Sequence, residues 1–189
     1  VTGVQTCALP ILVVVSRNNE AQDICSFELA SVDGQALPAF SAGAHIDVHL
    51  PDGLIRQYSL CNHPEEQHRY LIGVLKDPAS RGGSRCLHEH IQPGARLQIS
   101  APRNLFPLAH DARRSLLFAG GIGITPILCM AERLAHIGAD FELHYCARAS
   151  ERAAFVQRLK DASFAERVFL HFDEQRSEEH TSELQSPVL

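Results

Sequence analysis

Residues 56–61, Arg-Gln-Tyr-Ser-Leu-Cys, combine side-chain types that suit a flat, phosphorylated cofactor. On a β-strand, Arg56 and Tyr58 point to one face, whereas Ser59 points to the other. The guanidinium of Arg56 can pair with a phosphate, and the ring of Tyr58 can pack on a planar ring system. The backbone at Leu60 can offer N–H and C=O groups to the edge of that ring. The stretch therefore predicts one wall of a flavin site, although a Tyr beside a Ser on an edge strand is also common as plain structure.

A second group of candidate residues is suited to holding an anion. Gly82, Gly83 and Ser84 precede a helical pattern whose apolar stripe includes Leu87. The first turn of a helix has free backbone N–H groups and the positive end of the dipole. Lys76 adds positive charge nearby. These residues predict a phosphate site, and the alternative is a flexible loop followed by an ordinary serine cap.

A glycine-rich turn at residues 120–126 has the properties of a nucleotide site. Glycines let the backbone approach a ligand closely, and this turn joins a buried strand to a helix. In open α/β sheets, nucleotides bind at that position. The spacing is neither G-x-G-x-x-G nor a P-loop, so a plain tight turn is the alternative. The candidate residues are Gly120, Gly121, Ile122, Gly123, Thr125 and Pro126.

The elements that carry these groups follow two patterns. Up to about Pro107, about six short runs alternate apolar and polar residues, with turn signals between them. This pattern predicts a small antiparallel barrel. After Asp111 the order becomes strand, helix, strand, helix, strand, which predicts parallel pairing in an open α/β sheet. The expected strands there are 115–119, 141–146 and 167–172, the first buried on both faces, and the last expected helix is 150–159.

The helix that follows the glycine turn has recognisable end signals. Thr125 is expected to cap it, Pro126 to occupy its first position, and Gly138 to end it. Its expected apolar stripe consists of Ile127, Met130, Ala131 and Leu134.

Composition limits the function classes. The chain has 189 residues, 45% hydrophobic and 21% charged, with a net charge of -5. A negative balance argues against coating nucleic acid or anionic membrane, and no apolar run approaches the ~20 residues of a membrane span. The six cysteines form no C-x-x-C pair, which predicts buried free thiols in a reducing compartment. Without signal-peptide features, a cytoplasmic location is expected. The eleven histidines lack zinc-site spacing, so no metal site is predicted.

The two ends of the chain fit neither pattern. Residues 1–10 and 176–189 resemble translated sequencing-adapter sequence, and the second segment is expected to be disordered. The predicted organisation is a terminal extension at 1–10, a flavin-binding barrel at 11–108, a partial nucleotide-binding α/β domain at 109–175 and a tail at 176–189.

The three motifs, taken in order along residues 11–173, resemble the ferredoxin-reductase superfamily. Residues 100–108 and 141–148 are similar to its phthalate dioxygenase reductase and vanillate O-demethylase reductase branch. The resemblance implies FMN rather than FAD, with NADH as the electron donor. It implies that Lys76 and residues 82–84 hold the ring edge and phosphate of the flavin and that residues 120–126 receive NADH, with Thr125 near the nicotinamide. The residues that would line the flavin are Arg56, Tyr58, Ser59 and Leu60. Arg148 is either a partner for the adenosine ribose or a solvated side chain.

The chain departs from this family in two ways. It lacks the Cys-Gly-Pro-type motif that completes the nicotinamide pocket, and it lacks the Cys-x4-Cys-x2-Cys run of a plant-type [2Fe-2S] domain. In an intact parent, that cluster would pass electrons to the oxygenase component of a two-component aromatic-ring oxygenase or demethylase.

The function predicted from the resemblance is that of an NADH-dependent flavoprotein oxidoreductase. Ser59 and Thr125 are the predicted catalytic residues, because they would lie beside the two reacting rings and align them. The alternatives are a flavin-binding module without turnover, since the nucleotide domain is incomplete, and a barrel that binds no flavin.

Overall fold

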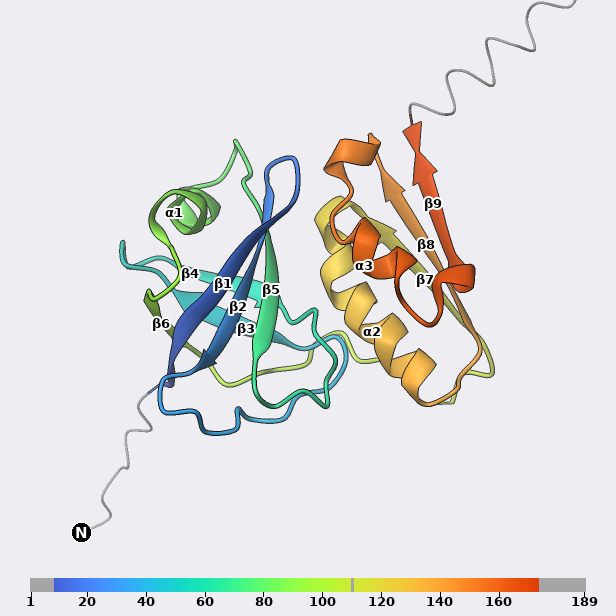
Figure 1. Ribbon diagram of the computed structural model, residues 1–189, viewed down its shortest axis with the longest axis horizontal. Coiled ribbons are helices and arrows are strands. Elements are labelled where there is room, and N and C mark those ends of the chain that lie inside the picture. Colours follow the sequence, from blue (N-terminus) through green and yellow to red (C-terminus); the bar gives the residue numbers. More distant parts are fainter. Residues whose placement is uncertain (1–8, 110, 174–189) are drawn as a thin grey trace, which may run out of the picture.

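The computed structural model describes residues 9–109 and 111–173, which form two sheets (Figure 1). The six-stranded sheet has the order β4-β3-β6-β1-β2-β5, and the three-stranded sheet has the order β7-β8-β9. The strands are β1 (Ile11–Ala21), β2 (Ile24–Ser31), β3 (His45–His49), β4 (Ile55–Ser59), β5 (Tyr70–Leu75), β6 (Arg96–Ile99), β7 (Ser115–Gly120), β8 (Phe141–Ala147) and β9 (Val168–Phe172). The α-helices are α1 (Gly83–His90), α2 (Ile124–His136) and α3 (Val156–Lys160).

The first sheet forms the predicted antiparallel barrel. Its two end strands approach each other where Leu60 forms a bridge with Ile72. Alternating side chains fill the interior, as Ile46 and Val48 of β3 show, and α1 adds the fully buried Leu87 to the same core. Pro10 also belongs to this unit, because its carbonyl accepts a hydrogen bond from the Ile99 N–H.

The second sheet confirms the predicted parallel α/β unit. Strand β7 pairs with β8, and β8 pairs with β9, all in parallel. Helix α2 crosses from β7 to β8 and buries the whole predicted stripe, which is Ile127, Met130, Ala131 and Leu134. The helix ends as predicted, with Gly138 at φ +67° just after its C-cap.

The predicted start of α2 is wrong in detail. The N-cap is Gly123, and no side chain caps it. Thr125 is the second helical residue, and its hydroxyl donates backwards to the Ile122 carbonyl at 3.1 Å. Pro126 is therefore the third helical residue rather than the first. The glycine turn tightens into a 3-10 turn, Gly121–Gly123, so the helix begins earlier than the cap signal indicates.

The prediction that residues 115–119 are buried on both faces is also wrong. Leu117 and Ala119 are each 6% exposed, but Leu116 is 55% and Phe118 is 65% exposed. Helices α2 and α3 lie between this sheet and the barrel (Figure 1). Both crossovers therefore cover one face, and within the described residues the other face has no cover.

The predicted helix at 150–159 is interrupted. A 3-10 turn, Ser150–Arg152, is separated from α3 by Phe155, whose φ of 61° is left-handed. The Ala154 N–H donates to the Tyr145 hydroxyl at 3.0 Å, and the Phe155 ring is 3% exposed. The burial of the ring and the tyrosine hydrogen bond override the helical periodicity here.

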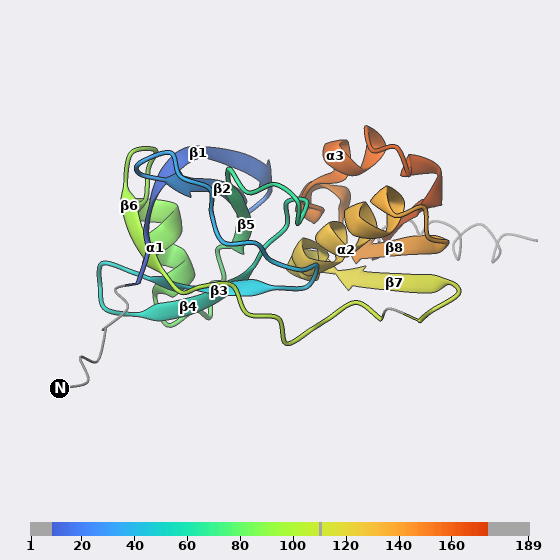
Figure 2. The ribbon, with the colours of Figure 1, turned by 90° about the horizontal axis from the view of Figure 1, so that it is seen from below.

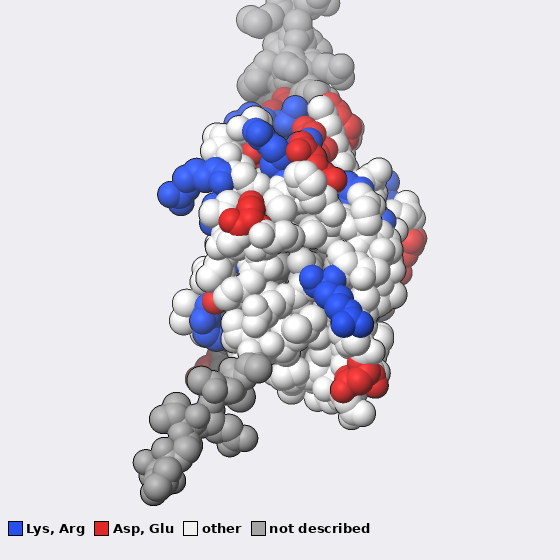
Figure 3. Space-filling model, turned by 90° about the vertical axis from the view of Figure 1, so that its left-hand side faces the viewer, with Lys and Arg blue, Asp and Glu red and all other residues white. Residues whose placement is uncertain are grey.

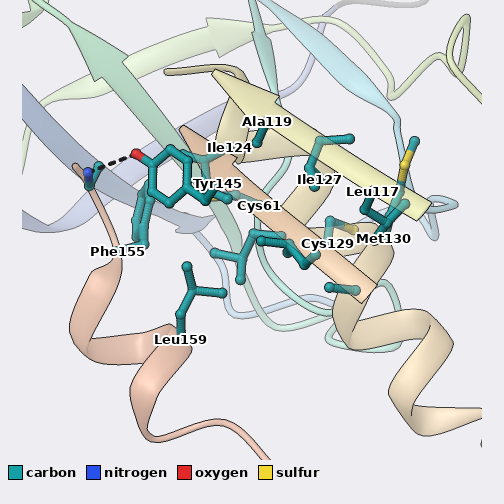
Figure 4. Packing of buried hydrophobic residues seen from close by; sticks show 14 of the residues in the cluster. Cys61, Leu117, Ala119, Ile124, Ile127, Cys129, Met130, Tyr145, Phe155 and Leu159 are labelled. Atoms are coloured by element: carbon teal, nitrogen blue, oxygen red, sulfur yellow. Dashed lines mark hydrogen bonds between the residues drawn. The ribbon is translucent and has the colours of Figure 1, made fainter. Parts of the chain in front are cut away.

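One apolar cluster joins the two units. Ile24, Ala42, Cys61 and Leu71 of the barrel belong to the same buried cluster as residues of α2, β7, β8 and α3. Figure 4 shows Cys61 among Ile124, Tyr145, Phe155 and other members of this cluster, with the Tyr145 hydrogen bond dashed. The barrel and the α/β unit therefore share a continuous core.

The surface at the barrel end carries charged side chains of both signs, interspersed among uncharged ones (Figure 3). None of the helices in the described part of the chain has both the length and the apolarity needed to cross a bilayer. Cys25, Cys61, Cys86 and Cys129 are buried free thiols, whereas Cys146 is exposed, contrary to the prediction; Cys7 lies outside the described residues.

Neighbouring residues of β7 provide a test of the uncovered sheet face. We expect Leu117→Ala to reduce the free energy of unfolding by about 2–5 kcal/mol, because it leaves a cavity in the shared core. We expect Phe118→Ala to cost less than about 1 kcal/mol, because its ring lies at the surface. Urea unfolding of the two variants measures both values. Equal costs would show that the face of Phe118 is covered in solution.

The three tyrosines provide a second test. Burial raises the pKa of Tyr58, Tyr70 and Tyr145 to about 12. Tyrosine in an unfolded chain has a pKa of about 10, so their stabilising contribution is complete below about pH 10 and is lost as the pH rises through about 12. We expect the tyrosinate absorbance of the folded chain to rise only near pH 12. A folded chain that titrates near pH 10, as the chain in denaturant should, would contradict this.

Candidate functional site

Strand β4 carries the predicted flavin wall at the edge of the barrel sheet. It is the terminal strand, so backbone groups on its outer edge lie outside the sheet ladder. Arg56 and Tyr58 pair with Val48 and Ile46 of β3, which places them on one face as predicted. Ser59 points to the opposite face and is half-buried.

Leu60 contributes to the site mainly as structure. Its side chain is fully buried in the barrel core. Its N–H donates to the Ala44 carbonyl at 2.9 Å, so this group is already used. Leu60 therefore holds the end of β4 in place, and the edge groups free for a ligand lie before it.

Arg56 and Gly83 are brought together at the first turn of α1. A β-carbon placed on Gly83 would lie 2.6 Å from Cγ and 2.8 Å from Nε of Arg56, so only glycine allows this contact. The helix N-cap is Gly82, at φ 101° and without a side-chain cap, which leaves first-turn N–H groups available. Arg81 and Arg85 are exposed on either side. Three guanidinium groups near a helix N-terminus fit a phosphate.

Tyr58 is suited to packing rather than to proton transfer. Burial is the main reason that its pKa rises to about 12, and the nearby Arg56 charge opposes the rise only in part. The hydroxyl therefore stays protonated near neutral pH. Its half-buried ring beside a basic side chain matches the predicted surface for a flat ring.

Lys76 and Ser84 lie near this turn but already have partners. The Lys76 ammonium is 3.0 Å from a carboxylate oxygen of Glu89 on α1. The Ser84 hydroxyl accepts a hydrogen bond from the Asp77 N–H at 3.3 Å. In this arrangement both residues stabilise the loop between β5 and α1.

The glycine turn opens onto a crevice between the two units. The crevice has a volume of about 570 Å³ and lies at the carboxyl ends of β7 and β8, where nucleotides bind in open α/β sheets. A β-carbon placed on Gly120, Gly121 or Gly123 would meet no atom within 4 Å, so this side of the turn has room for a ligand. The lining residues are Gln22, Ile24, Leu75, Asp77, Gly120, Gly121, Ile122, Cys146, Ala147, Arg148, Arg152 and Asp173.

The barrel forms one wall of this crevice, which the sequence did not indicate. Gln22 lies at the tip of the β1–β2 hairpin, and its N–H donates to the Glu151 carbonyl at 2.7 Å. Leu75 and Asp77 come from the end of β5 and the loop after it. No local pattern marks these residues, because their role arises only when the two units pack together.

The charged groups of the crevice are balanced. The positive charges of Arg148 and Arg152 are matched in number by the negative charges of Asp77 and Asp173. All four side chains are exposed. Arg148 lies where the predicted adenosine partner should be, at the end of β8. Arg152 was not predicted, although it follows Arg148 by four residues.

Thr125 lies behind the crevice rather than on its surface. It is 5% exposed, and its hydroxyl is bonded to the Ile122 carbonyl within the turn. Its methyl group points toward Gly73 of β5. Pro126 follows it and is half-buried. The structure therefore connects Thr125 to the shape of the turn and to the barrel contact.

A second cavity, of about 520 Å³, lies under the segment that connects the two units. Its lining includes Phe40, Asn104, Leu108, Arg133 and Ile137, and none of the predicted site residues. Among the described residues, no group of three or more His, Cys, Asp or Glu side chains is placed to hold a metal ion.

Known proteins match most of the chain. No family model matches it. Vanillate O-demethylase oxidoreductase of Pseudomonas putida is 81% identical over 163 residues, which are 86% of this chain and 51% of that relative. The protein of the same name from Pseudomonas sp. (strain HR199 / DSM 7063) is 65% identical over 153 residues, 81% of this chain and 48% of the relative.

A solved structure agrees with these relatives. Phthalate dioxygenase reductase, described as a modular structure for electron transfer from pyridine nucleotides to [2Fe-2S], matches with a TM-score of 0.85 and 42% identity over 87% of this chain and 52% of that one. The chain thus spans about half the length of the curated relatives it matches. It belongs to the phthalate dioxygenase reductase and vanillate O-demethylase reductase branch of the ferredoxin-reductase superfamily.

Proposed function

We propose that this chain is the flavin- and nucleotide-binding part of an NADH-dependent oxidoreductase that serves an oxygenase or demethylase. The observation that carries the proposal is the crevice of about 570 Å³, in which the glycine turn forms one wall and the barrel forms the other. A nucleotide held by the turn would lie against the unit that carries β4. The names of the relatives, which are oxidoreductases of demethylase and dioxygenase systems, support this proposal.

For the flavin, we propose FMN held along β4 and the first turn of α1. Arg56 and the free N–H groups of the turn Gly82–Ser84 would bind the phosphate. The ring of Tyr58 would pack on the flat ring system, with Ser59 at its edge. Lys76 would contribute at the ring edge only by leaving Glu89, with which it is paired.

For the donor, we propose NADH in the crevice. The turn Gly120–Gly123 would lie against the nicotinamide end, because its backbone is open to the cavity. Arg148 and Arg152 would lie toward the adenosine end. The flavin, when bound, would supply the redox chemistry, which is the transfer of a hydride from NADH and the release of single electrons.

The residues of this chain would act by alignment rather than by acid–base chemistry. Tyr58 stays protonated, and the Thr125 hydroxyl is engaged with the Ile122 carbonyl. We propose that Ser59 and Thr125 lie beside the two rings, Thr125 by holding the turn at the nicotinamide in shape. Holding two reactants in the correct geometry can supply a large part of a rate enhancement.

The wider assignment extends beyond this chain. We place the barrel at 11–108 and the nucleotide unit at 109–175. In the full-length protein, electrons would pass to a [2Fe-2S] domain and then to an oxygenase component acting on an aromatic substrate. Electron transfer from pyridine nucleotides to [2Fe-2S] in phthalate dioxygenase reductase supports the first part of that order.

The visible spectrum of the chain reconstituted with FMN tests the proposal. We expect a flavin band that bleaches when NADH is added without oxygen, because the crevice proposed for the donor has the barrel, the unit proposed to hold the flavin, as one wall. A band that persists would favour the alternative of a flavin-binding module without turnover. Folded protein that binds neither FMN nor FAD would contradict the site at Arg56 and Tyr58.

The role of Thr125 has its own test. We expect Thr125→Val to slow anaerobic flavin reduction by NADH by about 10-fold or more, while FMN affinity changes by less than about 3-fold. The substitution keeps the shape of the side chain but removes the hydrogen bond to the Ile122 carbonyl. Stopped-flow reduction and FMN titration measure the two effects. Equal reduction rates for the two proteins would show that the hydroxyl has no such role.

A further inference from the structure

We propose that Phe155 is a positioning residue that, with Gly73 and Thr125, sets the separation of the two units and therefore of flavin and nicotinamide. The inference rests on the proposed function and adds to it a residue that lies outside the three predicted motifs in the sequence. Gly73 lies in β5 of the barrel, whereas Thr125 and Phe155 belong to the α/β unit. Their contact is the closest approach of the two units at a glycine.

The space at Gly73 is fully used by the other unit. A β-carbon placed there would lie 2.7 Å from Thr125 Cγ2, and 3.1 and 3.2 Å from two ring carbons of Phe155. A carbon–carbon contact at 2.7 Å requires the neighbour to move, since such contacts are normally about 3.5–4.0 Å apart. The backbone of Gly73 does not need a left-handed conformation, so the requirement for glycine here is one of space.

Phe155 adopts an unfavourable backbone conformation in this position. Its φ of 61° is in the left-handed region, which a bulky side chain rarely adopts. The Ala154 N–H, one residue earlier, is fixed by the Tyr145 hydroxyl. The ring is 3% exposed and lies in the shared core (Figure 4). Strain of this kind persists only where surrounding contacts over-determine the geometry.

The contact connects the two walls of the crevice. Thr125 is the second residue of α2, directly after the glycine turn, and β5 ends at Leu75, which lines the crevice. A shift at Gly73 is therefore transmitted both to the turn and to the barrel wall. The Gln22 N–H, which donates to the Glu151 carbonyl across the same crevice, reports the separation independently.

A double-mutant cycle on the full chain with bound FMN tests the inference. We expect Gly73→Ala to slow flavin reduction at saturating NADH by about 10- to 100-fold, because a misplacement of about 1 Å has that effect. It should also speed hydrogen exchange at the Gln22 amide and leave FMN affinity within about 3-fold. In a Thr125→Ser background, which lacks the 2.7 Å contact but keeps the contacts with the Phe155 ring, Gly73→Ala should slow reduction by a clearly smaller factor than in the Thr125 background. An equal effect in both backgrounds would overturn the inference.

A second pair of variants covers the case in which Gly73→Ala does not fold. Phe155→Leu should slow flavin reduction and speed Gln22 exchange. Phe164→Leu is the matched control, since Phe164 is 5% exposed and packs on Phe141 at the opposite end of β8. It should lose stability without changing either readout. Equal reduction rates and Gln22 exchange for Phe155→Leu and Phe164→Leu would contradict a positioning role.

The proposed function and the inference fail separately. If the unmodified chain is not reduced by NADH, the proposed function fails for this chain. Amide exchange at Gln22 requires neither flavin nor NADH, so it still decides whether Gly73 and Phe155 set the separation. Unchanged exchange in both Gly73→Ala and Phe155→Leu overturns the inference in that case.

Discussion

The apolar core shared by the barrel and the α/β unit is the interaction on which the rest of the structure depends. A three-stranded parallel sheet with helices on one face is a small unit. One side of its helices packs on the sheet, and the apolar residues on the other side must be buried against a second partner. Here the barrel covers the outer side of α2 (Figure 2), and Cys61 and Leu71 lie in one cluster with Ile124 and Leu128. Burial raises the pKa of the Cys61 thiol, so it packs as a neutral, apolar group.

Charged groups surround this core rather than interrupt it. Glu132 of α2 pairs with Arg158 of α3 at 2.6 Å, and Glu65 of the barrel pairs with Arg133 of α2 at 2.9 Å. Burial is the main reason that the pKa of Glu132 is raised, and the Arg158 charge opposes it. Such pairs add little stability when exposed. The Glu65–Arg133 pair links the barrel to α2, whereas the Glu132–Arg158 pair links α2 to α3 within the α/β unit.

The alternation of apolar and polar residues was sufficient to predict those strands and helices that have one buried side and one side at the surface. Alternation predicted the barrel strands, because each faces one core and one surface. The stripe on α2 predicted its buried side for the same reason. The pairing of Arg56 with Tyr58 on one face of β4 follows directly from strand geometry. In these cases the sequence period and the three-dimensional environment carry the same information.

The predictions from sequence are wrong, or missing, where contacts between segments distant in the chain determine burial, a helix break or the lining of the crevice. The exposure of Phe118 depends on which face the crossover helices cover, and the sequence of β7 does not contain that information. The predicted helix at 150–159 is interrupted at Phe155, whose ring packs beside Gly73, more than eighty residues earlier in the chain. The same holds for Gln22 and Leu75, which become part of the crevice only through the packing of the units.

The proposed mechanism, in which the protein holds two ring systems in place, would need rigid contacts between the two units. A site that works by holding two reactants together depends on geometry, because a misplacement of about 1 Å can slow the reaction by about 100-fold. The groups here that could transfer protons are withdrawn: the Tyr58 hydroxyl stays protonated and the Thr125 hydroxyl is bonded to the backbone. In the proposed function, the close-packed contact at Gly73, with Phe155 in a strained conformation, would act as the spacer between the two units.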